Sequence, residues 1–542
     1  MRRRRLLLAA LVVVVAGGVA AALVLTLGNS NETRILVQQA VRLKHRVRPT
    51  VVRLQPTRRL KTAGAALLRR LTDEGHDEHR STTRAAAAGA TFVSKTTNPP
   101  TTAKALKASP GASDVALLDH SWFSGGNMSL TAEPTVAAND DRILGTWNWA
   151  AALSSDGGRT FTFADPFNDF PGSHDGFCCD QLAYYVPDSD LWVWLLQYGA
   201  DETGNILRLA VARGSAAFDA GRRNRTTFKL FDLSPSQFGW PADAEFDFNG
   251  ISSTKSSLFV STNVSSRAYE GLILRIPLDS LVRGVLQPSE MNYFKTPSGS
   301  VPRLARGAGT TMYFAVHKDA STLTVWSWPD GTLNLSRQDV PHDAYNLKKP
   351  YRCPRTGGSA SGDWCEGLRG GAYKNDDAIL SGWVAQGRVG FAWDAGQDGA
   401  RGLPYPYVMI VEVDANTLRL ADETLLWSPK YAYQYPAIVP NTRGDLAGVV
   451  LRGGGAANES CTAVIRDRST RGSGSGWASY TLAASNHAFG SPYTGDYLGA
   501  APLSAGSNAW IASCMTLRGG SNPLKNLRVH WFSFGRSADA PR

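Results

Sequence analysis

Four residues with side-chain oxygen atoms alternate along one short segment of the chain: Asp243, Glu245, Asp247 and Asn249. Because successive side chains of a strand point to opposite faces, a strand here would place all four on one face. Four neighbouring oxygen donors could hold Ca²⁺, and neighbouring carboxylates could act as acid and base on a glycosidic bond. A solvent-facing edge strand has the same pattern and is the more common outcome. The segment therefore gives two catalytic candidates, Asp243 and Glu245, and a weak calcium site as the only cofactor expected.

Aromatic and polar residues before expected inner strands give further binding candidates. Tyr431, Tyr433 and Tyr435 recur at every second position and would present one aromatic face, which suits stacking on sugar rings or packing inside the protein. Packing is the commoner outcome, and Tyr435 is the binding candidate of this group. Asp180 and Gln181 are candidates from the same kind of position, just before an expected inner strand. The remaining candidate, Asp363, lies with Trp364 in the loop that a Cys353–Cys365 disulfide would close.

The six cysteines are Cys178, Cys179, Cys353, Cys365, Cys461 and Cys514. None has the CxxC spacing of a zinc site, so disulfides in an oxidising compartment are the default. Cys353 with Cys365 and Cys461 with Cys514 are weakly favoured, which leaves the adjacent pair Cys178 and Cys179 to bond each other. Neighbouring Cα atoms are only about 3.8 Å apart, so the pairing of each with another cysteine is the more common alternative.

Other chemistry is excluded by the motifs and the charge. The sequence has no HExxH, no GxSxG and no P-loop, and its histidines lack metal-ligand spacing. Residues 1–107 hold 20 Lys and Arg against 5 Asp and Glu, a net charge of +15. Since the whole chain carries +11, the remainder carries 11 − 15 = −4. The basic character belongs to the N-terminal arm, and nucleic acid is not an expected partner.

The N-terminal arm begins with four arginines, which precede 22 uncharged residues from Leu6 to Leu27. This run is long enough to cross a bilayer, and the arginines would stay on the cytoplasmic side. We expect a signal or transmembrane anchor over residues 1–28 and favour an uncleaved anchor over a cleaved signal peptide. The protein is then a membrane protein with an extracellular head, or it is secreted.

Residues 29–115 are a mixture of basic residues with Ala, Thr and Pro, and they indicate a low-complexity stalk. A solvated linker is the simpler interpretation. The alternative is that its cations hold anionic envelope polymers or lipid headgroups near the membrane.

From about residue 130 onward, a two-strand unit recurs: an apolar run, a polar turn and a second apolar or aromatic run. Seven such units are found: 134–149, 181–198, 250–263, 306–317, 371–384, 436–451 and 498–514. Their spacing favours four-stranded propeller blades over the strands of two sandwiches. We predict an all-β fold with a β-propeller over residues 116–542, with seven blades favoured and six possible.

The segment Ser154–Phe161 reads Ser-x-Asp-x-Gly-x-Thr-aromatic, which is an Asp box. Ser154 and Asp156 have short polar side chains that can hydrogen-bond a tight turn, and Gly158 tolerates a positive φ. Thr160 and Phe161 would then start a strand. The pattern resembles the Asp-box (BNR) repeat of sialidases and related β-propellers, in which the box joins the two outer strands of a blade at the rim, away from the central ligand site.

The resemblance also implies what sialidase-type hydrolysis requires: three arginines, a tyrosine nucleophile with a glutamate, and an aspartate acid/base. Here the only Arg-Ile-Pro triplet, Arg275–Pro277, lies in mid-domain, where an outer strand ending in proline is the simpler interpretation. The segment 490–497 resembles the Gly-Asp-Tyr segment of sialidase-like propellers and makes Asp496 and Tyr497 binding candidates, with Asp496 also a catalytic one. The resemblance does not reach the full catalytic set.

These features favour an exported or membrane-anchored propeller that binds carbohydrate or another cell-envelope polymer at its axial funnel. A sialidase-like glycoside hydrolase is the first alternative, and a structural or protein-interaction propeller is the second. The sequence leaves the oligomeric state open.

Overall fold

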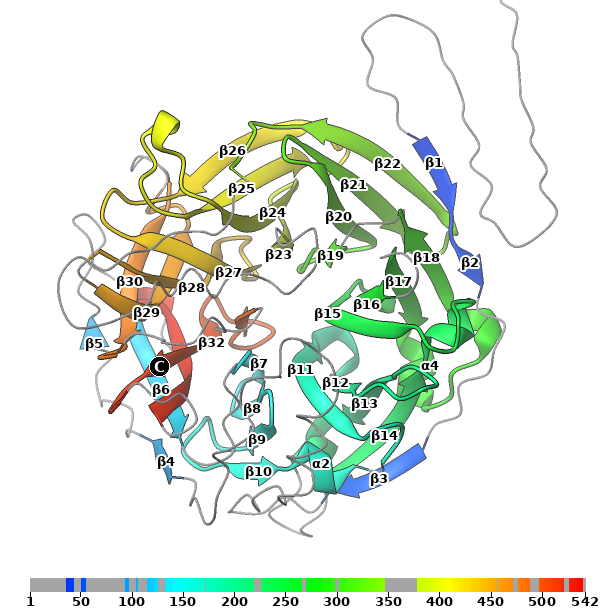
Figure 1. Ribbon diagram of the computed structural model, residues 1–542. Helices are drawn as coiled ribbons and strands as arrows, with labels where there is room; N and C mark the ends of the chain where they lie inside the picture. The colour runs from blue at the N-terminus through cyan, green and yellow to red at the C-terminus, as the bar shows by residue number, and fades with distance from the viewer. Residues whose placement is uncertain are drawn as a thin grey trace, which may run out of the picture.

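Strands dominate the protein and form seven sheets around a central axis (Figure 1). The computed structural model describes residues 36–42, 50–54, 93–96, 104–105, 115–124, 132–170, 172–218, 226–265, 270–297, 302–346, 378–455, 457–470, 476–487, 497–520 and 526–539. Each sheet is antiparallel, and its strands follow one another outward from the axis. The predicted all-β propeller is confirmed, and it has seven blades rather than six.

Each blade has four principal strands, of which the first is the innermost. Blade 1 consists of β7 (Thr135–Asn139), β8 (Arg142–Trp147), β9 (Ala150–Ser154) and β10 (Thr162–Ala164). Blade 2 consists of β11 (Phe177–Val186), β12 (Leu191–Tyr198), β13 (Leu207–Arg213) and β14 (Thr226–Leu233). Blade 3 consists of β15 (Glu245–Ser253), β16 (Ser257–Ser265), β17 (Glu270–Pro277) and β18 (Asn292–Thr296). Blade 4 consists of β19 (Arg303–Leu304), β20 (Thr311–Asp319), β21 (Thr322–Pro329) and β22 (Asn334–Pro341).

The remaining blades follow the same order. Blade 5 consists of β23 (Ile379–Ala385), β24 (Arg388–Ala395), β25 (Tyr407–Asp414) and β26 (Leu420–Leu426). Blade 6 consists of β27 (Ala432–Pro440), β28 (Leu446–Gly454), β29 (Ala457–Arg466) and β30 (Ala478–Ala484). Blade 7 consists of β31 (Gly499–Pro502), β32 (Trp510–Leu517), β33 (Leu527–Arg536) and, from the N-terminal side of the chain, β6 (Val115–Ser124). The pairing of β33 with β6 therefore closes the ring.

Part of the segment predicted as a stalk adds strands to the outer edges of the blades. Strand β1 (Leu36–Gln39) pairs with β22, β2 (Val41–Arg42) with β18, and β3 (Thr50–Leu54) with β14. Strands β4 (Val93–Thr96) and β5 (Lys104–Ala105) both pair with β6. The first three follow the rim of blades 4, 3 and 2 (Figure 1). The described part of this segment is thus built into the propeller.

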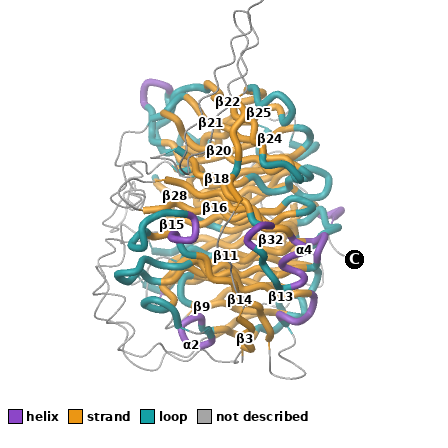
Figure 2. The backbone as a smooth tube through the Cα atoms, turned by 90° about the vertical axis from the view of Figure 1, so that its right-hand side faces the viewer, coloured by secondary structure: helices purple, strands orange, loops and turns teal. Residues whose placement is uncertain are grey.

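Short helices and turns lie on the two faces of the ring, with the strands between them (Figure 2). The helices are α2 (Pro166–Asp169), η1 (Pro187–Ser189), η2 (Gly214–Ala217), η3 (Pro235–Phe238), α4 (Leu278–Arg283), η4 (Pro288–Glu290), η6 (Gly399–Arg401) and η7 (Ser537–Asp539). Within the described ranges, no helix is long and apolar enough to span a membrane. The predicted anchor over residues 1–28 lies outside those ranges.

Hydroxyl side chains on or beside the innermost strands link neighbouring blades. Four of these links join blades 1 and 2, 3 and 4, 5 and 6, and 7 and 1. In that order, Ala183 N donates to Thr135 Oγ1 at 2.8 Å, Ser252 Oγ to Ala305 O at 2.8 Å, Ser381 Oγ to Pro436 O at 2.7 Å, and Ser513 Oγ to Pro134 O at 2.6 Å. They satisfy polar groups that the converging strands bury.

The cores lie between adjacent blades, where large aromatic side chains are fully buried. One cluster spans blades 1, 6 and 7 and contains Trp147, Trp510 and Trp531. Near the axis the strands need small residues, as at Gly499, where an added Cβ would lie 2.7 Å from Thr135 Cα. The apolar alternation of the sequence therefore supplies the blade interfaces, and glycine allows the inner strands to approach closely.

The Asp box forms the turn between β9 and β10, which are the two outer strands of blade 1. Ser154 Oγ accepts from Gly158 N at 2.9 Å, and the Asp156 carboxylate accepts from Thr160 N at 2.9 Å and Thr160 Oγ1 at 2.6 Å. Gly158 has a φ of 88°, and Phe161 packs into the core. These bonds and the positive φ confirm the predicted roles of Ser154, Asp156 and Gly158. Thr160 and Phe161 do not start the strand as predicted: both precede β10, which begins at Thr162, because Thr160 is still bonded to Asp156 within the turn.

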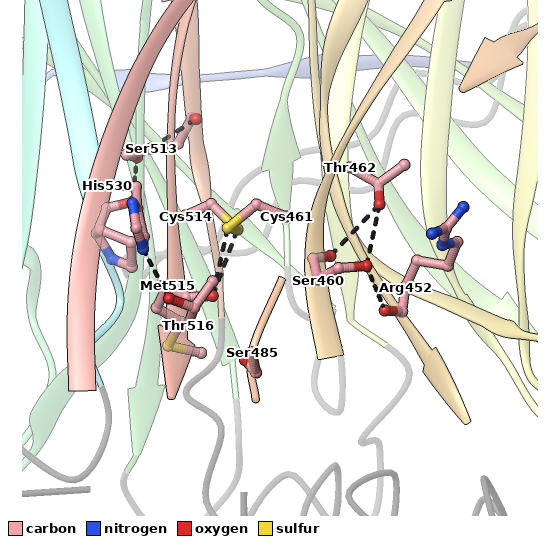
Figure 3. Close-up of a disulfide and its surroundings, with 12 residues drawn as sticks. Arg452, Ser460, Cys461, Thr462, Ser485, Ser513, Cys514, Met515, Thr516 and His530 are labelled. Carbon is pink, nitrogen blue, oxygen red and sulfur yellow. Dashed lines mark hydrogen bonds between the residues drawn. A yellow bond between two sulfur atoms is a disulfide. The ribbon is translucent and has the colours of Figure 1, made fainter. Parts of the chain in front are cut away.

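Two disulfides lie in the described part of the chain. Cys461 of β29 bonds Cys514 of β32, as predicted, and so ties blade 6 to blade 7 next to the ring closure (Figure 3). Cys178 and Cys179 bond each other at the start of β11, so the more common alternative, in which each pairs elsewhere, is wrong. Cys353 and Cys365 lie outside the described residues.

Candidate functional site

A pocket of about 510 Å³ opens on the axis where the innermost strands end. It is lined by the last residues of β7, β11, β15, β23, β27 and β31 and by the turns that follow them. We call it the axial pocket. Its volume lies within the range of small-molecule sites, and its contact with all seven blades is typical of a ligand site in a ring-shaped fold. The Asp box joins the outer strands, as expected, but it lies at the same end of its blade as this pocket, because β7 and β9 run in the same direction.

Three polar side chains from three blades are prominent in the axial pocket: Tyr184 of β11, Ser253 of β15, and Arg306, which follows β19. The Tyr184 hydroxyl and Ser253 Oγ lie 3.0 Å apart and share a hydrogen bond. The Arg306 guanidinium carbon lies 5.2 Å from the centre of the Tyr184 ring, which is within cation–π range. The site therefore combines a cation, an aromatic ring and hydroxyl groups.

Arg306 forms the boundary between the axial pocket and a narrower cavity of about 60 Å³ that lies deeper along the axis. The backbone of Arg306 is fixed by blade 5, because its N donates to Gly382 O at 2.8 Å and its O accepts from Val384 N at 2.7 Å. Its side chain crosses to blade 7, where Nη1 donates to Ala500 O at 2.9 Å. One end of the side chain is thus held by strand pairing and the other by a backbone carbonyl.

The electrostatics of Arg306 are unusual for a guanidinium in the interior of a protein. Burial lowers the pKa of Arg306, and the nearby Tyr184 only partly offsets this effect. No Asp or Glu in the described ranges forms an ion pair with it, and the one hydrogen bond of its guanidinium to the protein there is the bond to Ala500. A cation in this position attracts anionic groups from solution.

The rim of the axial pocket holds charges that are already balanced or exposed. Arg443 pairs with Asp445 at 2.9 Å and with Asp539 at 2.6 Å. Asp188, the one carboxylate among the described lining residues, is exposed. Burial, with a hydrogen bond to Asp190, raises the pKa of the neighbouring Tyr185 far above its ordinary value. That phenol therefore stays protonated at neutral pH.

The predicted binding residues at the start of β11 are structural. Gln181 is buried; its Nε2 donates to Trp147 O at 2.7 Å and its Oε1 accepts from Trp194 Nε1 at 2.8 Å. It thereby joins blades 1 and 2 and has no free face for a ligand. Asp180 is also buried, and it lies at the opposite end of β11 from the axial pocket.

The predicted tyrosines are also enclosed by protein. Tyr435 lies in the core of blades 1, 6 and 7, and its N donates to Asp394 Oδ1 at 2.9 Å across a bulge in β27. Tyr497 is buried before β31 and lines only the narrow cavity. Packing, the commoner outcome for such tyrosines, therefore applies to Tyr435.

The alternating acidic segment does not become a metal site. Within the described residues, no group of three or more His, Cys, Asp or Glu side chains could hold a metal ion. Asp243 is exposed before β15 begins at Glu245, and a bulge between Asp247 and Gly250 interrupts the alternation. Asp247 and Asn249 instead hydrogen-bond Gln197, at 3.2 and 2.6 Å. The four residues are therefore not assembled around Ca²⁺.

Two predicted residues, Asp363 and Asp496, lie outside the described residues. The Arg-Ile-Pro triplet ends β17, the third strand of blade 3, so the simpler interpretation is confirmed. Arg275 Nη1 donates to Pro329 O at 3.2 Å and Thr332 O at 2.8 Å, away from the axis. It supplies no cation to the axial pocket.

Sequence reasoning missed Arg306, Tyr184 and Ser253. It placed Arg306 at the first position of a repeat unit and looked for site residues at the starts of the inner strands, whereas the axial pocket is at their ends. The available signal was positional: all three residues lie at or just after the end of an innermost strand.

No family model matches the chain, and a search of curated proteins gives no match either. Among solved structures, the chain is similar in fold to the GH93 alpha-L-arabinofuranosidase of Fusarium graminearum with arabinobiose (11% identity, 77% of this chain and 99% of that chain, TM-score 0.37). It is also similar to the alpha-L-arabinanase of Penicillium chrysogenum (11%, 76% and 94%, 0.32) and to the Trypanosoma rangeli sialidase (8%, 72% and 58%, 0.33). The structural neighbours thus include sialidase-like β-propellers. At these identities and TM-scores, the likeness carries no argument about ligand or reaction.

Proposed function

We propose that this protein binds a carbohydrate or another surface polymer in the axial pocket without hydrolysing it. The observation that carries the proposal is the convergence of Tyr184, Ser253 and Arg306 on one pocket of about 510 Å³. A phenol, a hydroxyl and a guanidinium are groups that hydrogen-bond or pack against sugar hydroxyls and rings. The pocket narrows at Arg306, so it suits the end of a chain or a side branch.

Binding is favoured over hydrolysis by the carboxylates. Glycoside hydrolysis by the common mechanisms needs two carboxyl groups about 5–9.5 Å apart on either side of the scissile bond. The described lining of the axial pocket has one, the exposed Asp188. The alternative is a glycoside hydrolase using Asp243, Glu245 or Asp496. It requires a second site, because Asp243 and Glu245 lie at or just before the start of β15, at the opposite end from the axial pocket.

A glycan array combined with a reducing-sugar assay tests the proposal. We expect selective binding without release of product. Ala505→Trp fills the exposed mouth of the pocket and should abolish binding, whereas Ala400→Trp, at an exposed alanine outside the pocket, should not. Product release that is lost in Asp496→Asn would favour the hydrolase instead. The absence of both binding and turnover would favour the structural or protein-interaction alternative.

The apolar run Leu6–Leu27 supports export and membrane anchoring as part of the same proposal. Only eight residues separate it from β1, which pairs with the rim of blade 4. Fully extended, eight residues reach about 28 Å. An anchored propeller would therefore sit with this rim close to the bilayer instead of at the end of a long stalk. Mass spectrometry of the mature N-terminus distinguishes an anchored from a cleaved form.

A further inference from the structure

The buried and half-buried arginines of the described residues differ in whether they pair with a carboxylate. Arg208 pairs with Asp232 at 2.6 Å, Arg536 with Asp467 at 2.6 Å, and Arg466 with Glu412. These pairs match a buried cation with a carboxylate, which is the usual condition for burying charge. Arg306 has no such partner in the described ranges.

The geometry of Arg306 keeps its remaining donors available to a ligand. Its backbone is held between blades 4 and 5, and Gly307, with a φ of 79°, turns the chain away immediately after it. One guanidinium nitrogen is used by Ala500 O, whereas a guanidinium has five N–H groups in a planar fork. The residue borders the axial pocket, so an incoming group can reach the free side of the fork.

An anionic oxygen group would supply both things that the Arg306 guanidinium lacks: a negative charge beside it and acceptors for its remaining N–H donors. A carboxylate or sulfate supplies the missing negative charge and two acceptors spaced for the guanidinium fork. A neutral sugar hydroxyl supplies only the acceptor. Ser253 and Tyr184 also line the axial pocket and can hydrogen-bond ring hydroxyls beside the acidic group.

We propose that the ligand of the axial pocket is an acidic saccharide whose carboxylate or sulfate is bound by Arg306. This inference rests on the proposed function and names the class of ligand. Arg306 lies where the inner strands end, at the other end of those strands from Asp180 and Tyr435, so the acidic group would occupy the end of the axis that the sequence did not indicate.

The test uses an array of uronic-acid oligosaccharides, each beside its neutral methyl ester, and sulfated oligosaccharides, each beside its desulfated form. Titration calorimetry then measures the affinity for the best pair. We expect the full-length protein to bind the acidic member at least about tenfold more tightly than its neutral counterpart, equivalent to about 1.4 kcal/mol. The uronate and sulfate arms identify which acidic group is preferred.

Three variants distinguish an effect of the Arg306 charge on binding from an effect on folding. Arg306→Gln should remove the preference for the acidic member, and Arg306→Lys should keep part of it because the charge remains but the planar fork is lost. Arg275→Gln is the control, since Arg275 also lacks an ion pair in the described residues but does not line the axial pocket. It should behave like the wild type once its thermal unfolding shows that it is folded.

The outcomes distinguish this inference from the proposed function. If the wild type binds an acid and its neutral counterpart equally, or Arg306→Gln keeps the preference, the acidic class is overturned while carbohydrate binding stands. If no member of the array binds, both proposals fail.

Discussion

Two arginines of this propeller, the buried Arg536 and the half-buried Arg306, differ in the groups that surround their guanidinium. Arg536 of β33 lies between blades 6 and 7, where its Nε and Nη2 donate to the two oxygens of Asp467 at 2.6 and 2.9 Å. Both side chains are only 6% exposed. Arg306 faces the axial pocket with one carbonyl partner and no carboxylate among the described residues.

The partners of the guanidinium distinguish an arginine that stabilises the fold from an arginine that binds a ligand. Burial alone would raise the pKa of Asp467, but the hydrogen bonds and charge of Arg536 hold it below its usual range. That pair is complete within the protein. Arg306 lines the axial pocket and has one carbonyl partner for its guanidinium among the described residues, so we expect its anionic partner to come from solution. Arg275 also lacks an ion pair in the described residues but does not line the axial pocket. The site is therefore marked by an incomplete interaction at the wall of the pocket, rather than by a particular residue type.

The largest effect on the free energy of unfolding is expected from breaking the ion pair between Arg536 and Asp467. Arg536→Met leaves Asp467 buried without its partner and should lower the free energy of unfolding by about 3–5 kcal/mol. Arg306→Met removes a half-buried cation that has no carboxylate partner in the described residues, so its free energy of unfolding should change by no more than about 1 kcal/mol. Denaturant unfolding of both variants measures the contrast. Equal losses in the two would contradict the distinction between a structural and a functional arginine.

The next largest effect is expected on ligand affinity when Arg306 is given a carboxylate partner within the protein. Ser253→Asp introduces a carboxylate into the axial pocket, where it competes with the acidic group of a ligand. We expect about tenfold weaker binding of the best acidic oligosaccharide, measured by calorimetry. Ser253→Asn has nearly the same volume without the charge and is the matched control. Equal loss in both variants would mean that shape, and not charge, controls binding.

Two histidines at the ring closure, the half-buried His120 and the buried His530, are basic residues that stay uncharged at neutral pH. His120 Nε2 and His530 Nδ1 lie 2.9 Å apart across the closing strands β6 and β33, and His530 Nε2 lies 2.7 Å from Thr516 Oγ1. Burial lowers the pKa of His120 to about 4 and that of His530 well below its usual value. Below about pH 6.5 the unfolded chain therefore binds protons that the folded chain does not.

Stability should accordingly fall as the pH drops from about 6.5 toward 4, and this contribution should be fully present above pH 6.5. Thermal unfolding between pH 7.5 and 4.5 measures it. His120→Gln should flatten the dependence, because one of the two titrating groups is gone. An unchanged pH profile in this variant would show that the closing strands do not carry the sensitivity.

The smallest effect on the free energy of unfolding is expected at the Asp box. Its hydrogen bonds, like the Arg536 ion pair, are completed within the protein, but they stay within one turn that is partly exposed. Burial alone would raise the pKa of Asp156, whereas hydrogen bonds from Thr160 and Ser154 hold it below its usual value. Asp156→Ala should lower the free energy of unfolding by about 1 kcal/mol, as loss of a capping residue does. A loss as large as that of Arg536→Met would mean that the turn supports more than its own blade.

The sequence was most informative where the interactions are local. Ser154, Asp156 and Gly158 bond within one turn, so their spacing alone predicts both the turn and its place between outer strands. The blade count followed from the recurrent two-strand unit. The closing strand β6 was not foreseen, because its partner β33 is about 400 residues away in the chain and no local pattern links the two.

The site was poorly predicted for the same physical reason. Gln181 looked like a binding residue because it is polar beside a strand, but contacts from two blades use its side chain completely. Arg306 is defined by contacts with blades 2, 5 and 7 and by the absence of a carboxylate in the described surroundings. Whether a charge is paired depends on the assembled ring, and the spacing of residues along the chain does not contain that information.

The most direct measurement is a crystal structure of the protein with the acidic oligosaccharide that it binds most tightly. We expect an oxygen of the acidic group about 2.7–3.2 Å from a guanidinium nitrogen of Arg306, with the saccharide in the axial pocket. An acidic group bound at the opposite end of the inner strands, beside Asp180 or Tyr497, would contradict it.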